Sequence, residues 1–228
     1  MPEKQQHLQH GDNAPLLEDL RPGSHRVYFI FGGINSRIGM PPFEFYETAR
    51  ILDYSKVFFR DFSQAWYQCG LPGIAKDVFE LAEFIKSRIN ELQPREIYFT
   101  GNSMGGFAAI LFSSILGTGK AIAFSPQSCL SFSKRLGLGD RRWRKKIIRM
   151  YCKTMFRKHV YDLPDVMIDN HQDFTIDIHV SAGDQLDIKH ATALQHFSQV
   201  RIHRHDLGSH DLVRYLRDTG MLASIMAD

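Results

Sequence analysis

The chain alternates short apolar runs, rich in β-branched and aromatic residues, with longer segments of helical periodicity. Such runs are typical of buried β-strands, and they occur at residues 26–31, 56–61, 96–100, 120–124, 174–180 and 200–205. Residues 74–92 place apolar side chains three and four positions apart, and residues 107–116 are apolar on nearly every side, so both predict helices packed on a sheet. Shorter helices are expected at residues 190–197 and 211–216.

The order of these elements predicts an α/β fold. Strands and helices alternate without the Asn-Gly turns of β-hairpins, which favours a mainly parallel sheet of about six strands with helices on both faces. The alternation breaks at about residues 128–170, which we interpret as a helical lid inserted into a single domain of residues 25–228. Residues 1–24 hold Pro and Gly among polar residues and are expected to form a polar leader.

The composition agrees with one folded domain and limits the cellular compartments in which we expect the protein. With 228 residues, of which 43% are hydrophobic and 12% aromatic, the chain can bury one sizeable core and is unlike a disordered protein. Its apolar runs are much shorter than a membrane span, and its polar start does not resemble a signal peptide. The three cysteines lack disulfide or metal-binding spacing. We therefore expect a cytoplasmic protein.

A basic segment stands out against the small net charge of +3. Residues 134–158 contain eleven Lys and Arg but a single acid, Asp140, whereas the rest of the chain carries 17 basic and 24 acidic residues. Drawn as a helix, the segment has these inward-facing residues: Trp143, Ile147, Met150 or Tyr151, and Met155. Two interpretations stay open: a solvated face of the lid, or a surface that contacts an anionic substrate or the inner face of a membrane.

One motif carries candidate chemistry. Residues 101–105 read GNSMG and lie between an expected strand and an expected helix. In this context G-x-S-x-G is the pattern of a nucleophile elbow, a strained turn that lifts a serine hydroxyl above the edge of a sheet. Gly101 and Gly105 suit the turn because a Cβ atom there would clash with the crowded backbone. Ser103 is therefore the candidate nucleophile, and a tight turn of small residues is the alternative interpretation.

A serine nucleophile needs a base, and an acid that orients the base. His210 follows the last predicted strand in a Gly/Ser loop just before a helix, so it is the candidate base. The loop after the fifth predicted strand offers two carboxylates. Asp184 follows the strand more directly, and Asp187, three residues before His190, is also placed to cap a helix. From the residues alone, both carboxylates stay open as the acid.

Stabilisation of an oxyanion needs two backbone N–H groups. Met104, next to the candidate nucleophile, is expected to supply one of them. The second is expected from Gly33 or Ile34, in the Gly-Gly loop after the first predicted strand. An oxyanion hole is thus predicted where these two turns meet.

Three more side chains are placed at the same edge of the predicted sheet. Trp66 and Tyr67 follow the second strand, Gln127 follows the fourth, and all three are candidate substrate-binding residues. Buried loop packing is the alternative for the two aromatic residues. No metal-binding spacing occurs, and the later glycines of a dinucleotide motif are missing, so we expect no metal and no required cofactor.

Together these elements resemble the α/β-hydrolase superfamily over roughly residues 26–216. The runs GNSMGG, AFSPQ and GSHD, with the D-x-x-H loop at residues 187–190, are similar to those of small bacterial α/β hydrolases linked to surface-polysaccharide synthesis, which include glycan O-acetyltransferases. Their triad acid stands three residues before a histidine, so the resemblance implies Asp187. The chain departs from many esterases in its basic lid and in Phe31, which stands where they have His.

Three functions are compatible with these features. The first expectation is an esterase-type hydrolase, in which water resolves an acyl-enzyme formed on Ser103 from a small or carbohydrate ester. In the second, the acyl group passes to a sugar hydroxyl of a bacterial surface polysaccharide, with acetyl-CoA as a co-substrate whose phosphates meet the basic lid. The third is a catalytically silent module that binds an anionic ligand through residues 134–158. A nucleic-acid partner is not expected.

Overall fold

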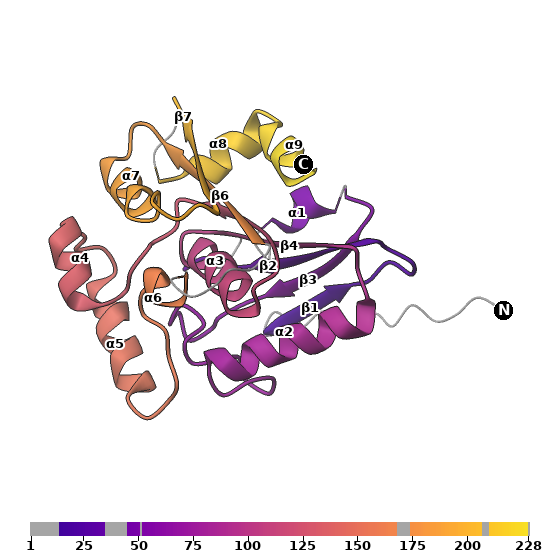
Figure 1. Ribbon diagram of the computed structural model, residues 1–228, viewed down its shortest axis with the longest axis horizontal. Helices are drawn as coiled ribbons and strands as arrows, with labels where there is room; N and C mark the ends of the chain where they lie inside the picture. The colour runs from indigo at the N-terminus through magenta and orange to yellow at the C-terminus, as the bar shows by residue number, and fades with distance from the viewer. Residues whose placement is uncertain (1–13, 35–44, 51, 168–173, 207–209, 228) are drawn as a thin grey trace.

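A mostly parallel β-sheet forms the centre of the protein. The computed structural model describes residues 14–34, 45–50, 52–167, 174–206 and 210–227. Its strands are β1 (Leu16–Asp19), β2 (Arg26–Phe31), β3 (Ser55–Phe59), β4 (Glu96–Asn102), β5 (Gly119–Phe124), β6 (Phe174–Ser181) and β7 (Val200–His205). The seven strands lie in the order β1-β3-β2-β4-β5-β6-β7, and every neighbouring pair is parallel except β1 with β3 (Figure 1). The six predicted strands are confirmed, with ends shifted by at most two residues.

The seventh strand, β1, lies in the segment that we expected to be a polar leader. In the register of this antiparallel pair, Leu16 lies opposite Phe59 and Asp19 lies opposite Lys56. The Asp19 carboxylate also forms an ion pair with the buried Lys56 ammonium at 3.1 Å. The leader prediction is therefore wrong for this strand, which edges the sheet. The strand was not predicted because it is short, contains two acidic residues and lies between prolines, all of which are unlike a buried strand. Residues 1–13 lie outside the described residues.

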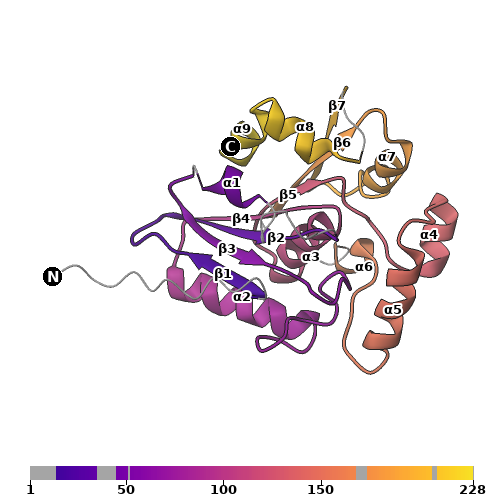
Figure 2. The same ribbon diagram turned by 180° about the vertical axis from the view of Figure 1, so that it is seen from behind.

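Both faces of the sheet are buried because the central strands have no polar side. In β2, Val27, Phe29 and Phe31 join one hydrophobic core, and Tyr28 and Ile30 join the other. The first core packs against α2 (Val78–Leu92) and α3 (Met104–Leu116), and the second against α1 (Tyr46–Ala49), α8 (Leu212–Asp218) and α9 (Met221–Ala227). Figures 1 and 2 show these two groups of helices on opposite sides of the sheet, as predicted.

The basic segment forms two helices of an insertion between β5 and β6. The insertion contains α4 (Phe132–Leu138), α5 (Arg144–Thr154) and α6 (Leu163–Met167), and it places α4 and α5 at one edge of the molecule (Figure 1). Ile147 and Met150 are buried, as expected, but Met155 lies beyond the end of α5 and is 66% exposed, so its inward placement was wrong. Residues 168–170 of the expected lid lie outside the described residues. None of the described helices is both long and apolar enough to cross a membrane.

Side-chain caps set two helix starts that periodicity alone misplaced. Helix α7 (Gln185–Thr192) begins earlier than the predicted segment 190–197, because the Asp184 carboxylate accepts hydrogen bonds from the N–H groups of Leu186 and Asp187, both at 3.0 Å. Asp77 caps the start of α2 in the same way. The first residues of α2 and α7 are therefore set by the aspartate that caps each helix.

The chain order of the strands places a topological switch point at one edge of the sheet. From β2 the chain passes to β3 on one side and later to β4 on the other, so the loops after β2 and β4 diverge at the carboxyl edge of the sheet. Open parallel sheets bind ligands at such points. Ser103 follows β4 and Gln127 follows β5, while Asp187 and His210 follow β6 and β7. The fold thus brings the predicted site residues to one edge.

Candidate active site

Ser103 occupies a strained turn between β4 and α3. Its backbone has φ 53° and ψ −112°, a region that side chains other than glycine rarely adopt. Two hydrogen bonds hold it there: its N–H donates to the Phe124 carbonyl at 2.8 Å, and its carbonyl accepts from the Phe107 N–H at 3.0 Å. The residue is 5% exposed. This is the backbone geometry expected of a nucleophile elbow.

The glycines around Ser103 are required by close backbone contacts. A Cβ atom on Gly105 would lie 2.0 Å from the Phe31 carbonyl oxygen, and one on Gly101 would lie 2.3 Å from the Gly105 carbonyl. The start of α3 therefore rests directly against the end of β2. The steric explanation of the motif is confirmed at both glycines.

We expect Gly105→Ala to destabilise the protein by roughly 3 kcal/mol or more, because its Cβ meets backbone atoms that cannot move aside. The matched control is Gly137→Ala in α4, where a new Cβ meets no atom within 4 Å. That change should stabilise the protein by about 0.5–1 kcal/mol through helix propensity. Urea unfolding measures both variants, and equal shifts in the two would contradict the close packing of the elbow.

A chain of buried hydrogen bonds connects Ser103 to the loop after β3. The Gln127 side-chain NH₂ group donates to the Ser103 Oγ at 3.1 Å. The Trp66 indole N–H in turn donates to the side-chain oxygen of Gln127, Oε1, at 2.9 Å. The Tyr67 hydroxyl lies 3.0 Å from the Gly32 carbonyl oxygen, to which it is placed to donate. Both aromatic residues are buried and positioned by protein groups. Of the three predicted substrate-binding residues, the structure places Gln127 in direct contact with Ser103.

The unusual loop that carries Trp66 and Tyr67 is held by Asp61. The Asp61 carboxylate accepts hydrogen bonds from the N–H groups of Ser63, Ala65 and Tyr67, at 2.8, 2.7 and 3.0 Å. Burial raises the pKa of this carboxyl, against the opposing effect of those hydrogen bonds. Trp66 and Tyr67 both have positive φ, so the bonds to Asp61 hold a strained backbone in this loop.

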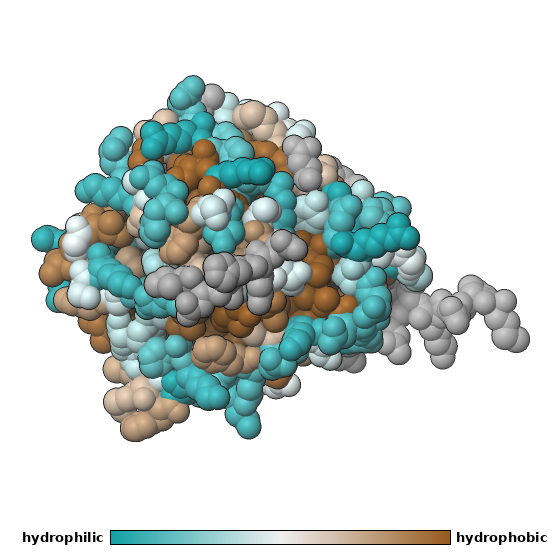
Figure 3. Space-filling model, in the orientation of Figure 1, coloured by the Kyte–Doolittle hydropathy of each residue, from teal (hydrophilic) through white to brown (hydrophobic). Residues whose placement is uncertain are grey.

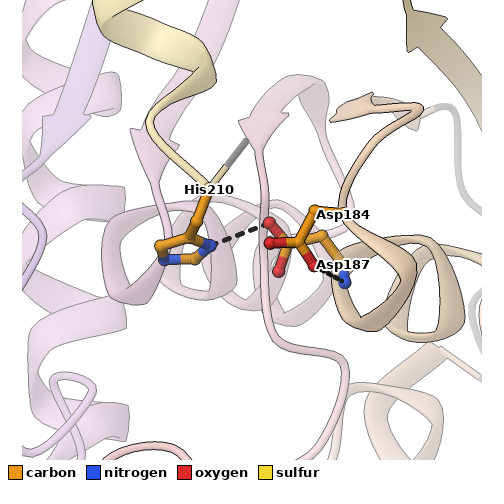
Figure 4. A group of neighbouring side chains, drawn as sticks. All are labelled: Asp184, Asp187 and His210. Carbon is orange, nitrogen blue, oxygen red and sulfur yellow. Dashed lines mark hydrogen bonds and ion pairs between the residues drawn. The ribbon is translucent and has the colours of Figure 1, made fainter. Parts of the chain in front are cut away.

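His210 forms its hydrogen bond with Asp187 and not with Asp184. The His210 Nδ1–H donates to the Asp187 Oδ2 at 2.8 Å, and Asp187 is fully buried at the first turn of α7 (Figure 4). Asp184 lies beside them but serves as the cap of α7. From the residues alone both carboxylates stayed open as the partner of the histidine, and the hydrogen bond falls on Asp187, which the resemblance implies. The capping role that was considered for Asp187 belongs to Asp184. With Nδ1 bonded to Asp187, the His210 Nε2 is left for proton transfer.

An arginine from the insertion also contacts Asp187 and His210. The Arg142 Nη1 donates to the Asp187 Oδ1 at 2.7 Å and lies 3.3 Å from the His210 Nδ1. Arg142 also pairs through its Nε with the Asp140 Oδ1 at 3.3 Å. Sequence reasoning missed Arg142. The available signal was Asp140, the single acid of the basic segment, since a lone acid among cations marks a place where one of them turns inward.

A second histidine is tied into the same buried network. The Ser128 N–H donates to the His190 Nδ1 at 3.1 Å, so the His190 Nε2–H donates to the Asp140 Oδ2, 3.0 Å away. Arg135 lies 3.3 Å from the other oxygen of Asp140. His190, which follows Asp187 by three residues, thus anchors the insertion to α7.

The charges of this network keep its two carboxyl groups ionised. Burial alone would raise the pKa of Asp187, but hydrogen bonds and charges from His210 and Arg142 outweigh burial and hold this pKa below its ordinary value. The pKa of Asp140 is likewise held low, because the hydrogen bond from His190 and the charges of Arg142 and Arg135 outweigh its burial. An ionised Asp187 is what an orienting acid requires.

The two turns that carry the predicted oxyanion donors lie next to each other at the elbow. Met104 is the first residue of α3, so its N–H has no acceptor within the helix. Gly33 and Ile34 follow β2, whose last carbonyl contacts Gly105. The Ile34 carbonyl accepts a hydrogen bond from the Gln64 amide at 2.8 Å, which fixes that turn. The two predicted turns therefore adjoin, and the role of their N–H groups stays a prediction.

Asp184, Asp187 and His210 are also close enough to be considered as metal ligands. Their ligand atoms lie within 4.8 Å of one another. Three of the four carboxylate oxygens are already used, however, by the helix cap, by His210 and by Arg142, whose guanidinium lies 2.7 Å from Asp187. A fixed cation at this position opposes a second one, so we assign no metal to the cluster.

Comparison with known proteins identifies the fold. No family model and no curated protein matches the sequence. Among solved structures, the chain is similar to the capsule O-acetyltransferase of Neisseria meningitidis serogroup A, with a TM-score of 0.67 and 15% identity over 92% of this chain and 90% of that chain. A mutant of that enzyme in complex with CoA gives a TM-score of 0.62 and 15% identity, over 91% and 90% of the two chains.

Ester hydrolases share the architecture. A carboxylesterase of the thaumarchaeon Nitrososphaera gargenis has a TM-score of 0.58 and 10% identity, over 93% of this chain and 95% of that chain. These likenesses extend over nearly the whole of each chain. The chain therefore has the fold of the α/β hydrolases.

Proposed function

We propose that this protein is a serine-dependent acyl-transfer enzyme with Ser103, His210 and Asp187 as its catalytic triad. One observation carries the proposal: the buried Asp187 holds His210 at 2.8 Å, at the same sheet edge where Ser103 occupies a positive-φ turn. A serine in a strained strand-to-helix turn has no structural advantage over glycine. Its presence at the same sheet edge as an oriented histidine is explained by nucleophilic catalysis.

In the first half-reaction, the Ser103 hydroxyl proton passes to the His210 Nε2 as the Oγ bonds to the acyl carbonyl carbon. The negative charge on the carbonyl oxygen is stabilised by the Met104 N–H and by that of Gly33 or Ile34. When the carbonyl re-forms, the bond to the leaving group breaks, and the leaving oxygen or sulfur takes the proton from His210. The acyl-enzyme and the free alcohol or thiol result.

In the second half-reaction, an acceptor hydroxyl gives its proton to His210 and attacks the acyl carbon. The Ser103 oxygen leaves and regains the proton, so the enzyme returns to its starting state. Asp187 stays ionised throughout and stabilises the imidazolium that forms twice in the cycle. The chemistry is the same whether the acceptor is water or a sugar.

For the acceptor we propose a carbohydrate hydroxyl, with acetyl-CoA as the acyl donor. The support is the likeness to a capsule O-acetyltransferase, which is higher in TM-score, 0.67, than the likeness to the carboxylesterase, 0.58. The carboxylesterase likeness favours ester hydrolysis as the second candidate. Acetyl-CoA would then be replaced by an ester substrate, and no cofactor would be required. We further propose that the enzyme works inside the cell.

The acceptor is tested by following CoA release from acetyl-CoA with a thiol reagent, with and without a panel of methyl glycosides and purified bacterial polysaccharides. Transfer predicts that release rises with a carbohydrate acceptor and that this acceptor gains acetyl esters by mass spectrometry. Release independent of any carbohydrate, together with rapid p-nitrophenyl acetate cleavage, would favour the hydrolase. The absence of any acyl-enzyme would favour a silent binding module.

Arg142 is a positioning residue for this chemistry, and its replacement should move the pH profile. We expect Arg142→Gln to lower kcat up to about 100-fold by loosening the Asp187–His210 geometry. Without the guanidinium, the pair binds its proton more readily, so the acidic limb of kcat/KM shifts to higher pH. Arg142→Lys should recover part of both effects.

The control for Arg142 is Arg214→Gln, which removes an exposed cation of α8 and should change neither kcat nor the pH profile. The measurement is the kcat/KM of p-nitrophenyl acetate hydrolysis between about pH 5 and 9, the range in which His titrates. A purely structural role for Arg142 would reduce activity without displacing the acidic limb.

A further inference from the structure

The insertion exposes an unusual amount of apolar side chain. Of the nine large hydrophobic residues that are exposed among the described residues, five lie on α4, on α5 or just after α5. They are Phe132, Leu136, Ile148, Met155 and Phe156. Phe156 is 92% exposed and Met155 66%. Such clustering in a soluble domain marks a surface that meets a partner or a membrane.

Cations accompany these apolar residues on the same helices. The exposed basic residues of this segment that form neither an ion pair nor a side-chain hydrogen bond with any described residue are Arg141, Arg144, Lys145, Arg149, Lys153 and Lys158. Arg157 is also exposed, but it donates hydrogen bonds to the carbonyl oxygens of Cys69 and Lys76. The only acid between residues 132 and 159 is Asp140, which is buried in the active-site network. The surface is therefore strongly positive. We call these exposed cations and the five apolar residues the α4–α5 surface.

Helix geometry turns this surface away from the domain. In α5, Ile147, Met150 and Thr154 are buried against the protein, so Ile148 and the cations around it face outward. In α4, Phe132 and Leu136 are four residues apart and share one face. Figure 3 shows hydrophobic residues beside hydrophilic ones along the edge where Figure 1 places α4 and α5.

We propose that the α4–α5 surface docks the enzyme on an anionic lipid bilayer. Cations that flank protruding Phe, Met, Ile and Leu side chains match the two layers of such a surface, which are phosphate headgroups and then acyl chains. A polyanionic glycan would use the cations but leave Phe156 and Met155 in water. A second copy of this chain would bring like charges together. The lipid surface satisfies both kinds of residue.

Docking would act on the enzyme's location and not on its chemistry. The inward cations Arg135 and Arg142 belong to the active-site network and are not part of the docking surface. Substitutions on the α4–α5 surface should therefore impair docking without impairing the triad, and the two proposals can be tested separately. The inference goes beyond the proposed function and does not depend on Ser103.

The test is co-sedimentation of the full chain with vesicles. We expect binding to phosphatidylcholine vesicles that contain about 30% phosphatidylglycerol, with at least tenfold weaker binding to phosphatidylcholine alone. Raising the salt from about 0.1 M to 0.5 M should weaken the binding, because headgroup attraction is screened. The Ser103→Ala variant should bind as the wild type does, which separates docking from catalysis.

Two groups of substitutions measure separately how much the cations and the apolar side chains contribute to vesicle binding. Replacing Arg144, Lys145 and Arg149 together with Gln should weaken the binding about 100-fold, at about fivefold for each cation. The double variant Met155→Ser, Phe156→Ser should weaken it at least about tenfold through lost apolar insertion. The matched controls are the triple Gln variant of the exposed residues Lys86, Arg95 and Arg201, and Met221→Ser on α9, all of which should bind normally.

Three outcomes would overturn the proposal. Equal binding to neutral and anionic vesicles, or none to either, would exclude an anionic bilayer. Control variants that weaken binding as much as the α4–α5 variants would show only non-specific attraction. Binding that is lost with the cations but unchanged by Met155→Ser, Phe156→Ser, and that is competed by a soluble polyanion, would assign the surface to an anionic polymer instead.

Discussion

Replacing Ser103 with alanine will abolish turnover while leaving the fold intact. We predict a loss in kcat of at least about 10⁴-fold, because the alanine side chain carries no hydroxyl that can attack the acyl carbon. The residual rate comes from substrate binding and from the oxyanion donors. The measurement is the kcat/KM of p-nitrophenyl acetate hydrolysis, together with thermal unfolding of the same preparation.

The matched control is Ser114→Ala, which removes another buried hydroxyl, near the C-terminal end of α3 and far from the elbow. This variant should retain full activity. A Ser103→Ala protein that unfolds at the wild-type temperature yet keeps more than about a tenth of the activity would remove Ser103 from the mechanism. Ser103→Cys, which keeps a nucleophile, should remain open to acylation.

The second large effect separates two neighbouring aspartates. Asp187→Asn should lower kcat by about 10⁴-fold, because an amide holds His210 in the wrong tautomer without changing the shape of the site. Asp184→Asn should change kcat less than about threefold, because asparagine caps a helix as well as aspartate does. Steady-state kinetics on the two variants gives the ratio directly.

The two substitutions are matched in chemistry and lie three residues apart, so each serves as the control for the other. Equal and mild effects would place the orienting acid elsewhere. A large effect of Asp184→Asn with a small effect of Asp187→Asn would contradict the hydrogen bond seen between His210 and Asp187. Unfolding measurements should show the greater loss of stability for Asp187→Asn, since it leaves the partly buried Arg142 without one partner.

Local patterns were enough to predict the strands and the elbow. Strand β2 is apolar at consecutive positions because both of its faces are buried, and that run needs no tertiary information to be seen. The motif around Ser103 is equally local: Gly101 and Gly105 are close in space and only four positions apart in the sequence. Features set within a few residues could therefore be predicted correctly.

Features that depend on distant partners could not be predicted. Strand β1 is defined by its pairing with β3, about forty residues later, and not by its own short polar sequence. The choice between Asp184 and Asp187 depends on which carboxylate caps α7, and the role of Arg142 depends on where the insertion folds back onto the sheet. Each requires the three-dimensional arrangement of elements far apart in the chain.

The most direct test of the central claim is the intact mass of the protein after brief exposure to a fluorophosphonate probe, followed by peptide mapping. The account predicts one adduct on the wild type, located at Ser103, and none on Ser103→Ala. Asp187→Asn should label much more slowly than Asp184→Asn. An adduct of equal extent on Ser103→Ala, or no adduct on the folded wild type, would contradict an activated serine at the elbow.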